Sequence, residues 1–370
     1  MDTPLISKDE IKKKLRVRLT QTDENACFIF GAGASFGYST AISKPPTVKD
    51  LFEDDNPIVQ EVINRREHGS IKTNRQHLST QLRNYDNDLE QYLSFMYERN
   101  SADNLFSNLL VYLEDIFFKA SEDFVSEPNN YKTLINLMWD LHGNKRWSCI
   151  SFNYDTLLER SYLEARRDPT GRAFDSLKSY TDPNPTILKI HGGINFRYAH
   201  TKPLEYGDDQ VKLTNYTLFS KMMSNEGKLA NGLLEVIHPE SHKPANYDSY
   251  YNKASAQISS WGFPLMLIPI HATIKPENIF FKNMIDLAKK EIERSSIIIA
   301  IGYNFGDESF ISELSRLDLS GKEIILVNTL ESIKDISNHL GYQRIKTALP
   351  GVNLTIFDGN GFKGFIEAIQ

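Results

Sequence analysis

The chain has 370 residues, of which 40% are hydrophobic and 24% are charged, and its formal net charge is -6 at pH 7. This length allows one large α/β domain with insertions, or two domains. The acidic balance argues against a protein that mainly neutralises nucleic-acid phosphates, so we expect no direct nucleic-acid binding.

The cysteine content and the hydropathy of the chain exclude further kinds of protein. The two cysteines, Cys27 and Cys149, lie in apolar runs and are too few for a four-cysteine zinc ribbon. Both are typical of buried thiols in a reducing compartment. We find no signal-peptide pattern and no apolar run of membrane-spanning length, so we expect a cytoplasmic protein without a membrane segment.

The first expected elements are a helix and a buried strand. Ser7 and Glu10 form a capping-box pattern, which predicts a helix from about Lys8. An apolar run at 26–30 then leads into GAGASFG at 31–37. Closely spaced glycines after such a strand predict a phosphate-holding turn at a helix N-terminus. The spacing differs from the dinucleotide fingerprint by one residue, and a tight turn without a ligand is the alternative.

Two long stretches interrupt the β pattern. Residues 41–142 carry apolar side chains at three- and four-residue steps, which predicts a helical insertion. We interpret its aromatic residues as helix packing. Residues 196–261 are polar and show no clear period, so we expect a second, smaller insertion there. The remaining residues, 1–40 and 143–370, form the predicted core.

Most of the later predicted strands end in polar residues or glycine. Continuous apolar runs alternate with helices, which predicts an α/β, Rossmann-like, mostly parallel six-stranded sheet covered by helices on both faces. Because the carboxyl ends of parallel strands open on one edge, we expect these residues to share one pocket. Seven runs are the candidates for these roughly six strands: 26–30, 147–152, 187–190, 264–269, 297–301, 323–328 and 354–357.

Five motifs, in this order and each at a strand end, resemble the SIR2-like (sirtuin-related) NAD-binding family. They are GAGAS at 31–35, NYD at 153–155, KIHG at 189–192, IGYNFGD at 301–307 and ILVN at 325–328. The match covers the α/β core and leaves both insertions unmatched. Within the family the chain looks like the bacterial branch found in anti-phage defence. The run PLMLIP at 264–269, with Lys275 after it, also resembles that branch.

The resemblance implies catalytic roles for two residues. Asn153 would hold a water or a ribose hydroxyl beneath the anomeric carbon, and His191 would act as general base or as partner of a ribose hydroxyl. Asp155 would receive the carboxamide of nicotinamide. The alternatives are that Asn153 and Asp155 are helix caps and that His191 is a packed turn residue.

The resemblance also implies which residues bind the rest of NAD+. Asn328 would contact the adenosine ribose, in place of the usual acidic residue, or is a simple loop asparagine. Asp307 is a further candidate that the N-terminus of its helix explains equally well. We expect no metal site, because the histidines show no metal-ligand spacing. The residues expected at the diphosphate are Gly31, Ala32, Gly33, Ser35, Gly302 and Asn304.

These features together predict a SIR2-like NAD+ glycohydrolase that releases nicotinamide and ADP-ribose as the effector of an antiviral system. The resemblance to such effectors implies that the chain forms a homo-oligomer. It also implies a companion ATPase or nucleic-acid sensor from the same operon. The alternatives are an NAD-dependent protein deacylase, an ADP-ribosyltransferase, or a non-catalytic NAD or nucleotide sensor. The family's deacylases carry a four-cysteine zinc ribbon, which two cysteines cannot build.

Overall fold

The structure is a computed structural model. It describes residues 5–20, 25–39, 44–85, 89, 92–93, 95–96, 104–142, 147–166, 174, 177–181, 185–198, 234–236, 264–266, 279–329, 340–357 and 359–370.

The core is one parallel sheet of seven strands, in the order β1-β10-β9-β8-β2-β3-β4. The α/β prediction is confirmed, but the predicted count of six strands is wrong by one. The extra strand, β1, has two residues that pair with β10 at the edge, too few to give a hydropathy pattern. The strands are β1 (Leu5–Ile6), β2 (Asn25–Phe30), β3 (Trp147–Ser151), β4 (Thr186–Lys189), β8 (Ser295–Ile301), β9 (Glu323–Val327) and β10 (Asn353–Phe357).

A second sheet has three antiparallel strands: β5 (Gly192–Tyr198) lies between β6 (Leu234–Val236) and β7 (Pro264–Met266). The prediction that β7 belongs to the parallel sheet is therefore wrong. An apolar run has the same pattern whichever sheet buries it, so hydropathy cannot assign the partner. Most of the predicted insertion at 196–261 lies outside the described residues, as does Lys275.

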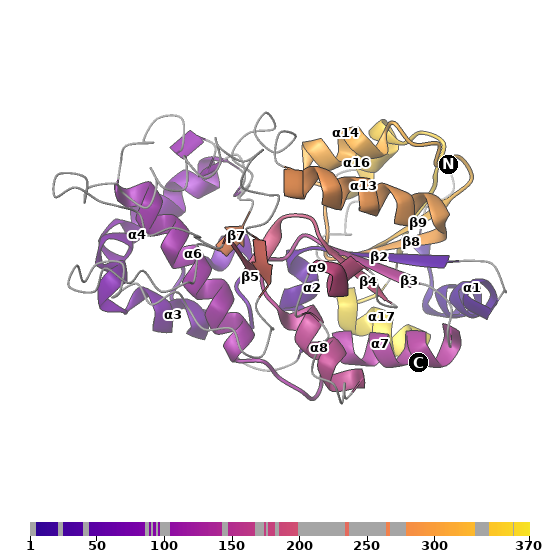
Figure 1. Cartoon of the computed structure of the whole chain (residues 1–370), viewed down its shortest axis with the longest axis horizontal. Coiled ribbons are helices and arrows are strands. Elements are labelled where there is room, and N and C mark those ends of the chain that lie inside the picture. The colour runs from indigo at the N-terminus through magenta and orange to yellow at the C-terminus, as the bar shows by residue number, and fades with distance from the viewer. Residues whose placement is uncertain are drawn as a thin grey trace.

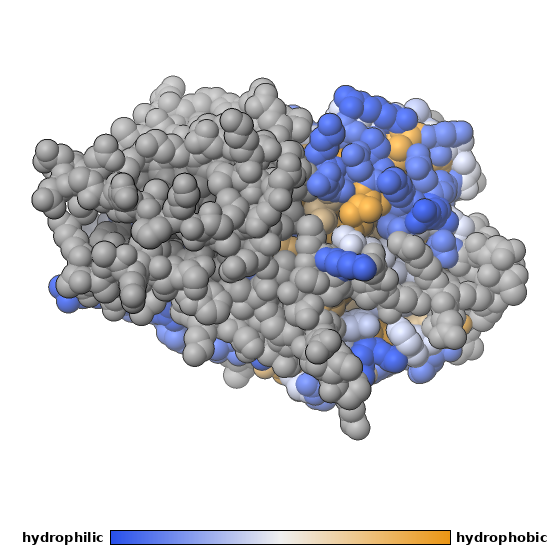
Figure 2. Space-filling view, viewed as in Figure 1, coloured by the Kyte–Doolittle hydropathy of each residue, from blue (hydrophilic) through white to orange (hydrophobic). Residues whose placement is uncertain are grey.

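Helices cover both faces of the parallel sheet (Figure 1). On one face lie α1 (Lys8–Thr20), α7 (Asn130–His142), α8 (Leu157–Arg166) and α17 (Gly361–Ile369). On the other lie α13 (Ile279–Arg294), α14 (Glu308–Leu314) and α16 (Leu340–Ala348), whose outer surface is mainly hydrophilic (Figure 2). Two short helices, α2 (Ala32–Phe36) and α9 (Leu177–Thr181), follow β2 and precede β4. No helix in the described part of the chain is long and apolar enough to cross a membrane.

The capping box predicted for the first helix is present. The Glu10 amide donates to Ser7 Oγ at 3.3 Å, and the Ser7 amide donates to Glu10 Oε2 at 3.1 Å. These two bonds satisfy amide donors that the first turn of a helix leaves without partners. Helix α1 accordingly begins at Lys8.

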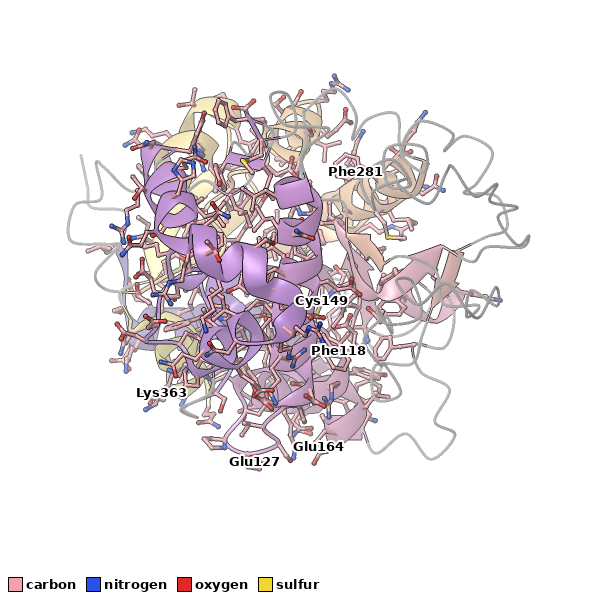
Figure 3. The ribbon with its side chains drawn as sticks, turned by 90° about the vertical axis from the view of Figure 1, so that its left-hand side faces the viewer. Phe118, Glu127, Cys149, Glu164, Phe281 and Lys363 are labelled. Carbon is pink, nitrogen blue, oxygen red and sulfur yellow. The ribbon has the colours of Figure 1, made fainter. Side chains whose placement is uncertain are left out.

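The helical cluster, as we call the helices between residues 48 and 122, packs around a hydrophobic core of its own. Tyr92, Tyr112 and Phe118 are buried in it, which agrees with the interpretation of the aromatic residues as helix packing. Figure 3 looks onto this cluster, with the sheet behind it. Its elements are η1 (Val48–Asp50), α3 (Pro57–Ile63), η2 (Arg66–His68), α4 (Gly69–Asn84) and α6 (Asn104–Glu122).

Helix α7 packs with the core of the parallel sheet, although we predicted that residues 41–142, which include it, form a helical insertion. Its buried residues Tyr131, Leu134, Ile135 and Met138 join the core of the parallel sheet. The domain boundaries at 40 and 142 stay a prediction. Helix α7 follows the helical cluster in the chain and carries Tyr131, which contacts the site described below.

Both cysteines lie in the middle of the parallel sheet, Cys27 on β2 and Cys149 on the adjacent β3. Burial raises the pKa of Cys27 to about 12 and raises the pKa of Cys149 well above the usual thiol value. Both therefore stay protonated and act as small apolar side chains, as expected.

Candidate active site

The carboxyl ends of β2 and β8 mark the point where the chain changes its direction across the sheet. From β2 the chain proceeds to β3 and β4 on one side, and it then returns to β8, β9 and β10 on the other side. Open α/β sheets bind ligands in the crevice at such a switch point. The glycine turn follows β2, and Gly302 follows β8, so both predicted phosphate loops lie at this crevice.

The glycines at this edge let the two loops pack backbone against backbone. Gly33 N donates to Gly302 O at 3.1 Å, and Gly31 N donates to Ile301 O at 3.1 Å. Gly302 has a φ of +60°, and a Cβ there would lie 2.2 Å from Ala34 N. A side chain at Gly302 would therefore strain the backbone and separate the loops. The amides of Gly31 and Gly33 are used within the chain, and the diphosphate roles predicted for this turn stay predictions.

Asn153 is buried at the end of β3 and is held by the glycine turn. Its Nδ2 donates to Gly31 O at 2.9 Å and to Ser35 Oγ at 2.9 Å. It does not cap α8, because Asp155 Oδ1 accepts the bond from Leu157 N at 3.1 Å. The amide orientation that these bonds require leaves Asn153 Oδ1 as an acceptor for a water or a hydroxyl.

Tyr131 of α7 completes this group, and the sequence analysis missed it. Its hydroxyl lies 3.3 Å from Ser35 Oγ and accepts a long bond of 3.4 Å from Asn153 Nδ2. Burial raises the pKa of Tyr131 well above its usual value, so the hydroxyl stays protonated. Helical spacing indicates only that Tyr131 is buried, and its contact with the turn follows from how α7 packs on the sheet.

His191 follows β4 closely and pairs with Asp307, which follows β8. The distance from Nε2 to Asp307 Oδ2 is 2.6 Å, and the side chains are 5% and 2% exposed. Asp307 Oδ1 accepts a bond from Phe310 N at 3.0 Å, so the same carboxylate also caps α14. Both interpretations of Asp307 are thus compatible. An ionised carboxylate only accepts hydrogen bonds, which makes Nε2 the protonated nitrogen and Nδ1 the basic one.

Aromatic rings join the ends of β3, β4 and β8. The His191 ring meets Phe152 edge-on at a centroid distance of 5.1 Å, and Phe152 stacks on Tyr303 at 4.2 Å. Phe305, which is buried beside Tyr303, has a φ of +51°, a conformation uncommon for a residue with a side chain. The rings hold the histidine beside the segment that carries Asn153.

Asn304 and Asn328 meet at the neighbouring ends of β8 and β9. Asn328 Nδ2 donates to Asn304 Oδ1 at 3.1 Å. Arg344 of α16 reaches the same corner, where its Nη1 donates to Asn304 O at 3.3 Å. Arg344 was not predicted from the sequence, because it lies inside a helix and in none of the five motifs.

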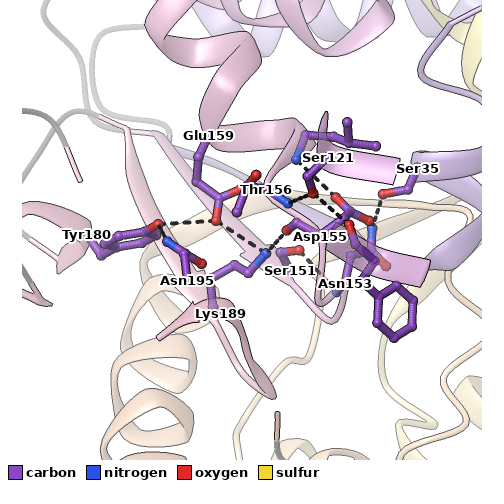
Figure 4. Close-up of polar contacts among 12 residues, drawn as sticks. Ser35, Ser121, Ser151, Asn153, Asp155, Thr156, Glu159, Tyr180, Lys189 and Asn195 are labelled. Carbon is purple, nitrogen blue, oxygen red and sulfur yellow. Dashed lines mark hydrogen bonds and ion pairs between the residues drawn. The ribbon is translucent and has the colours of Figure 1, made fainter. Parts of the chain in front are cut away.

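A buried polar network contacts the backbone of Asp155 (Figure 4). Lys189 Nζ donates to Asp155 O at 2.5 Å and lies 3.3 Å from Glu159 Oε1. Tyr180 OH donates to the same Glu159 oxygen at 3.3 Å, and Asn195 Nδ2 donates to that hydroxyl at 2.5 Å. Burial raises the pKa of Glu159, and the charge of Lys189 opposes this change.

The predicted site residues therefore lie at one edge of the sheet in three connected groups. The first contains the glycine turn with Ser35, Asn153 and Tyr131, the second His191 with Asp307, and the third Asn304 with Asn328. Asp155 lies two residues after Asn153 of the first group. Its carbonyl accepts a hydrogen bond from Lys189 of the buried network. Within the described residues, no group of three or more His, Cys, Asp or Glu side chains could hold a metal ion.

Comparison with known proteins gave matches among solved structures alone. No family model and no curated protein matches the chain. A Sir2 homologue in complex with NAD matches at 14% identity and a TM-score of 0.42, covering 96% of this chain and 92% of the other. A structure from work on the mechanism and regulation of Sir2 enzymes matches at 11% identity and 0.39, covering 96% of each chain.

A third solved structure, a mutant Sir2 homologue with ADP-ribose, matches at 14% identity and a TM-score of 0.31, covering 91% of this chain and 96% of the other. The five motifs and the geometry of this edge support the function proposed below.

Proposed function

We propose that this chain is a SIR2-like NAD+ glycohydrolase, which cleaves NAD+ to nicotinamide and ADP-ribose. One observation carries the proposal. An amide, Asn153, and a buried imidazole–carboxylate pair, His191 with Asp307, lie at the same switch-point edge as the glycine turn. This is the combination that binding a dinucleotide and activating a hydroxyl or water requires.

The reaction breaks the bond between C1′ of the ribose and the ring nitrogen of nicotinamide. The electrons of that bond pass to the positively charged ring, so nicotinamide leaves as a neutral molecule. A water oxygen forms the new bond to C1′, and the water gives up one proton. In the proposed roles Asn153 Oδ1 holds the water or a ribose hydroxyl, and His191 Nδ1 takes a proton, by itself or through that hydroxyl.

Asp155 would receive the carboxamide of nicotinamide in this scheme. Its Oδ1 caps α8, and its carbonyl accepts the bond from Lys189, so its backbone is held from two directions. A fixed backbone limits the positions that the second carboxylate oxygen can take. Such restraint supports a binding role, because a positioned group loses little entropy when the ligand binds.

The biological role is a further part of the proposal and rests on the five motifs alone. NAD+ depletion would make the chain the effector of an anti-phage defence system, working as a homo-oligomer with an operon-encoded ATPase or nucleic-acid sensor. The same edge could serve a deacylase, an ADP-ribosyltransferase or an NAD sensor. The presence of Asn153 and His191 together at this edge favours catalysis over sensing, since binding alone does not require a base beside the amide.

The assay that separates these functions uses the purified chain with NAD+ alone and with NAD+ plus an acetylated peptide. Nicotinamide release without peptide is the expected result. Release that depends on the peptide and yields a deacetylated product would replace the hydrolase by a deacylase. ADP-ribose attached to protein would indicate a transferase instead.

Asn153→Ala tests the site itself. We expect nicotinamide release to fall about 100-fold or more, because the acceptor that positions the nucleophile is lost. Asn56→Ala is the matched control, since Asn56 caps α3 in the helical cluster and accepts bonds from Ile58 N and Val59 N. The control should lose about 1 kcal/mol of stability and keep its turnover. Unchanged turnover in a folded Asn153→Ala protein would refute the site.

A further inference from the structure

One arginine at the edge of the site has no role in the proposed reaction. Arg344 lies on α16, and its guanidinium approaches the loop after β8, with Nη1 3.3 Å from Asn304 O. The same Nη1 would lie 3.2 Å from a Cβ built on Gly306, so the group rests on this loop. Among the residues that the structure describes, no carboxylate pairs with it.

Two neutral side chains, Asn304 and Asn328, meet at the corner that Arg344 reaches. Asn328 Nδ2 donates to Asn304 Oδ1, which leaves the Asn304 amide nitrogen as a donor on an exposed side chain. The nearby acid, Asp307, is buried and bonded to His191 and to the start of α14. The corner therefore combines a guanidinium with an amide donor.

Dinucleotide pockets use charge to distinguish an adenosine ribose with a free 2′-hydroxyl from one with a 2′-phosphate. A carboxylate at the strand end binds the ribose hydroxyls and repels a 2′-phosphate, whereas a nearby arginine accommodates that phosphate. Here Asn328 stands at the end of β9 where a carboxylate would exclude phosphate, and Arg344 lies beside its partner Asn304. The planar guanidinium can give two parallel hydrogen bonds to a phosphate.

We propose that this corner accepts a dinucleotide whose adenosine ribose carries a 2′-phosphate, as in NADP+, and that Arg344 holds the phosphate. The amide of Asn304 supplies a second donor. The inference rests on the proposed function, with the adenosine ribose at Asn328 as the family resemblance implies. It extends the substrate class of the site from NAD+ to its phosphorylated form.

Binding of two reaction products tests the inference without turnover. ADP-ribose and 2′-phospho-ADP-ribose both lack nicotinamide, so titration calorimetry with the full chain measures affinity alone. We expect the phosphorylated ligand to bind at least as tightly as ADP-ribose. Arg344→Ala should shift the ratio of the two dissociation constants against the phosphorylated ligand by about tenfold or more. Arg344→Lys should give an intermediate ratio, because it keeps the charge and loses the planar fork.

Lys346→Ala is the matched control for charge. Lys346 lies on the same helix, but its ammonium is 5.5 Å from the ring centroid of Tyr342. The substitution removes one positive charge from α16, and the ratio should stay within about twofold of the wild type. Asn328→Asp is the reverse test. It brings a carboxylate to the strand end and should move the ratio against the phosphorylated ligand even with Arg344 present.

Two results would overturn the inference and leave the proposed function standing. One is a wild-type chain that binds ADP-ribose and rejects its 2′-phosphate form. The other is a ratio that Arg344→Ala leaves unchanged. Failure to bind either ligand would instead count against the proposed function, and this inference would be lost with it.

Discussion

Two buried histidine–aspartate pairs in this protein have nearly the same geometry. His191 Nε2 lies 2.6 Å from Asp307 Oδ2 at the carboxyl edge of the sheet, and His68 Nε2 lies 2.7 Å from Asp115 Oδ2 in the helical cluster. All four side chains are at most 5% exposed. A hydrogen-bonded imidazole and carboxylate are therefore not enough to identify a catalytic site.

The surroundings of the two pairs differ. Asp307 binds Phe310 N with its second oxygen, whereas Asp115 Oδ1 and His68 Nδ1 have no hydrogen-bond partner among the described residues. Arg65 Nη1 lies 3.5 Å from Asp115 Oδ2 and forms an ion pair with this carboxylate. The second pair joins η2 to α6 inside the helical cluster, so we expect a structural role for it. We conclude that the position at the sheet edge, and not the pair itself, indicates function.

The largest expected effect separates the pairs by activity. His191→Ala should lower nicotinamide release by about 100- to 10,000-fold, because the proposed base is removed. His68→Ala should leave turnover within about twofold of the wild type, since its ring packs against Asp115 and Tyr112 in the helical cluster. Both should lower the free energy of unfolding by about 1–3 kcal/mol, as each leaves a buried carboxylate without its ring partner.

Initial rates of nicotinamide release and urea unfolding of the same two proteins measure both quantities. Similar losses of stability would serve as an internal control. Equal losses of turnover in the two variants would contradict the assignment of His191, because a general loss of folding would then explain both.

A smaller effect is expected from the two aspartates. In Asp307→Asn the amide oxygen can still accept the bond from Phe310 N and keep the cap of α14. Its nitrogen would then face His191 Nε2 and favour the tautomer in which Nδ1 carries the proton. We expect nicotinamide release to fall at least about tenfold, with a changed pH–rate profile. Asp115→Asn should change neither quantity, and a normal pH profile in Asp307→Asn would refute the role of the carboxylate.

The parallel sheet was predictable from the sequence because β2, β8 and β9, at its centre, contain continuous apolar runs. The positions of Asn153, His191 and Asn328 followed from the same rule, since each stands at or just after the end of a strand of this sheet. A two-residue strand such as β1 has no pattern to detect. The apolar sequence of β7 is compatible with either sheet, and pairing in space decided between them.

The contacts that complete the site were not predictable, because they join distant parts of the chain. Tyr131 reaches Ser35 across 96 residues, and His191 reaches Asp307 across 116. Arg344 comes to Asn304 across 40 residues. Sequence periodicity says which side of a helix is buried, whereas these contacts depend on how α7, α14 and α16 pack on the sheet.

The smallest expected effect concerns a third buried acid, Glu159, which differs from both aspartates in its partner, Lys189. Burial raises the pKa of Glu159 above 4.5, so the folded protein holds a proton at a pH where the unfolded chain has lost it. This contribution to stability is complete below about pH 4.5 and is lost as the pH rises through the raised pKa. Glu159→Gln removes it, and we expect a change of the order of 1 kcal/mol in the pH dependence of unfolding.

Glu313 provides a control of opposite sign. A hydrogen bond from Lys289 is the main cause that lowers the pKa of Glu313, so its contribution is present above about pH 4.5 and is lost as the pH falls. Urea unfolding across this range should show a flatter decline with rising pH in Glu159→Gln and a weaker loss at low pH in Glu313→Gln. Identical pH profiles in wild type and Glu159→Gln would mean that Lys189 compensates the burial of Glu159 completely. In that case the buried network would match the two histidine pairs in holding a charged carboxylate.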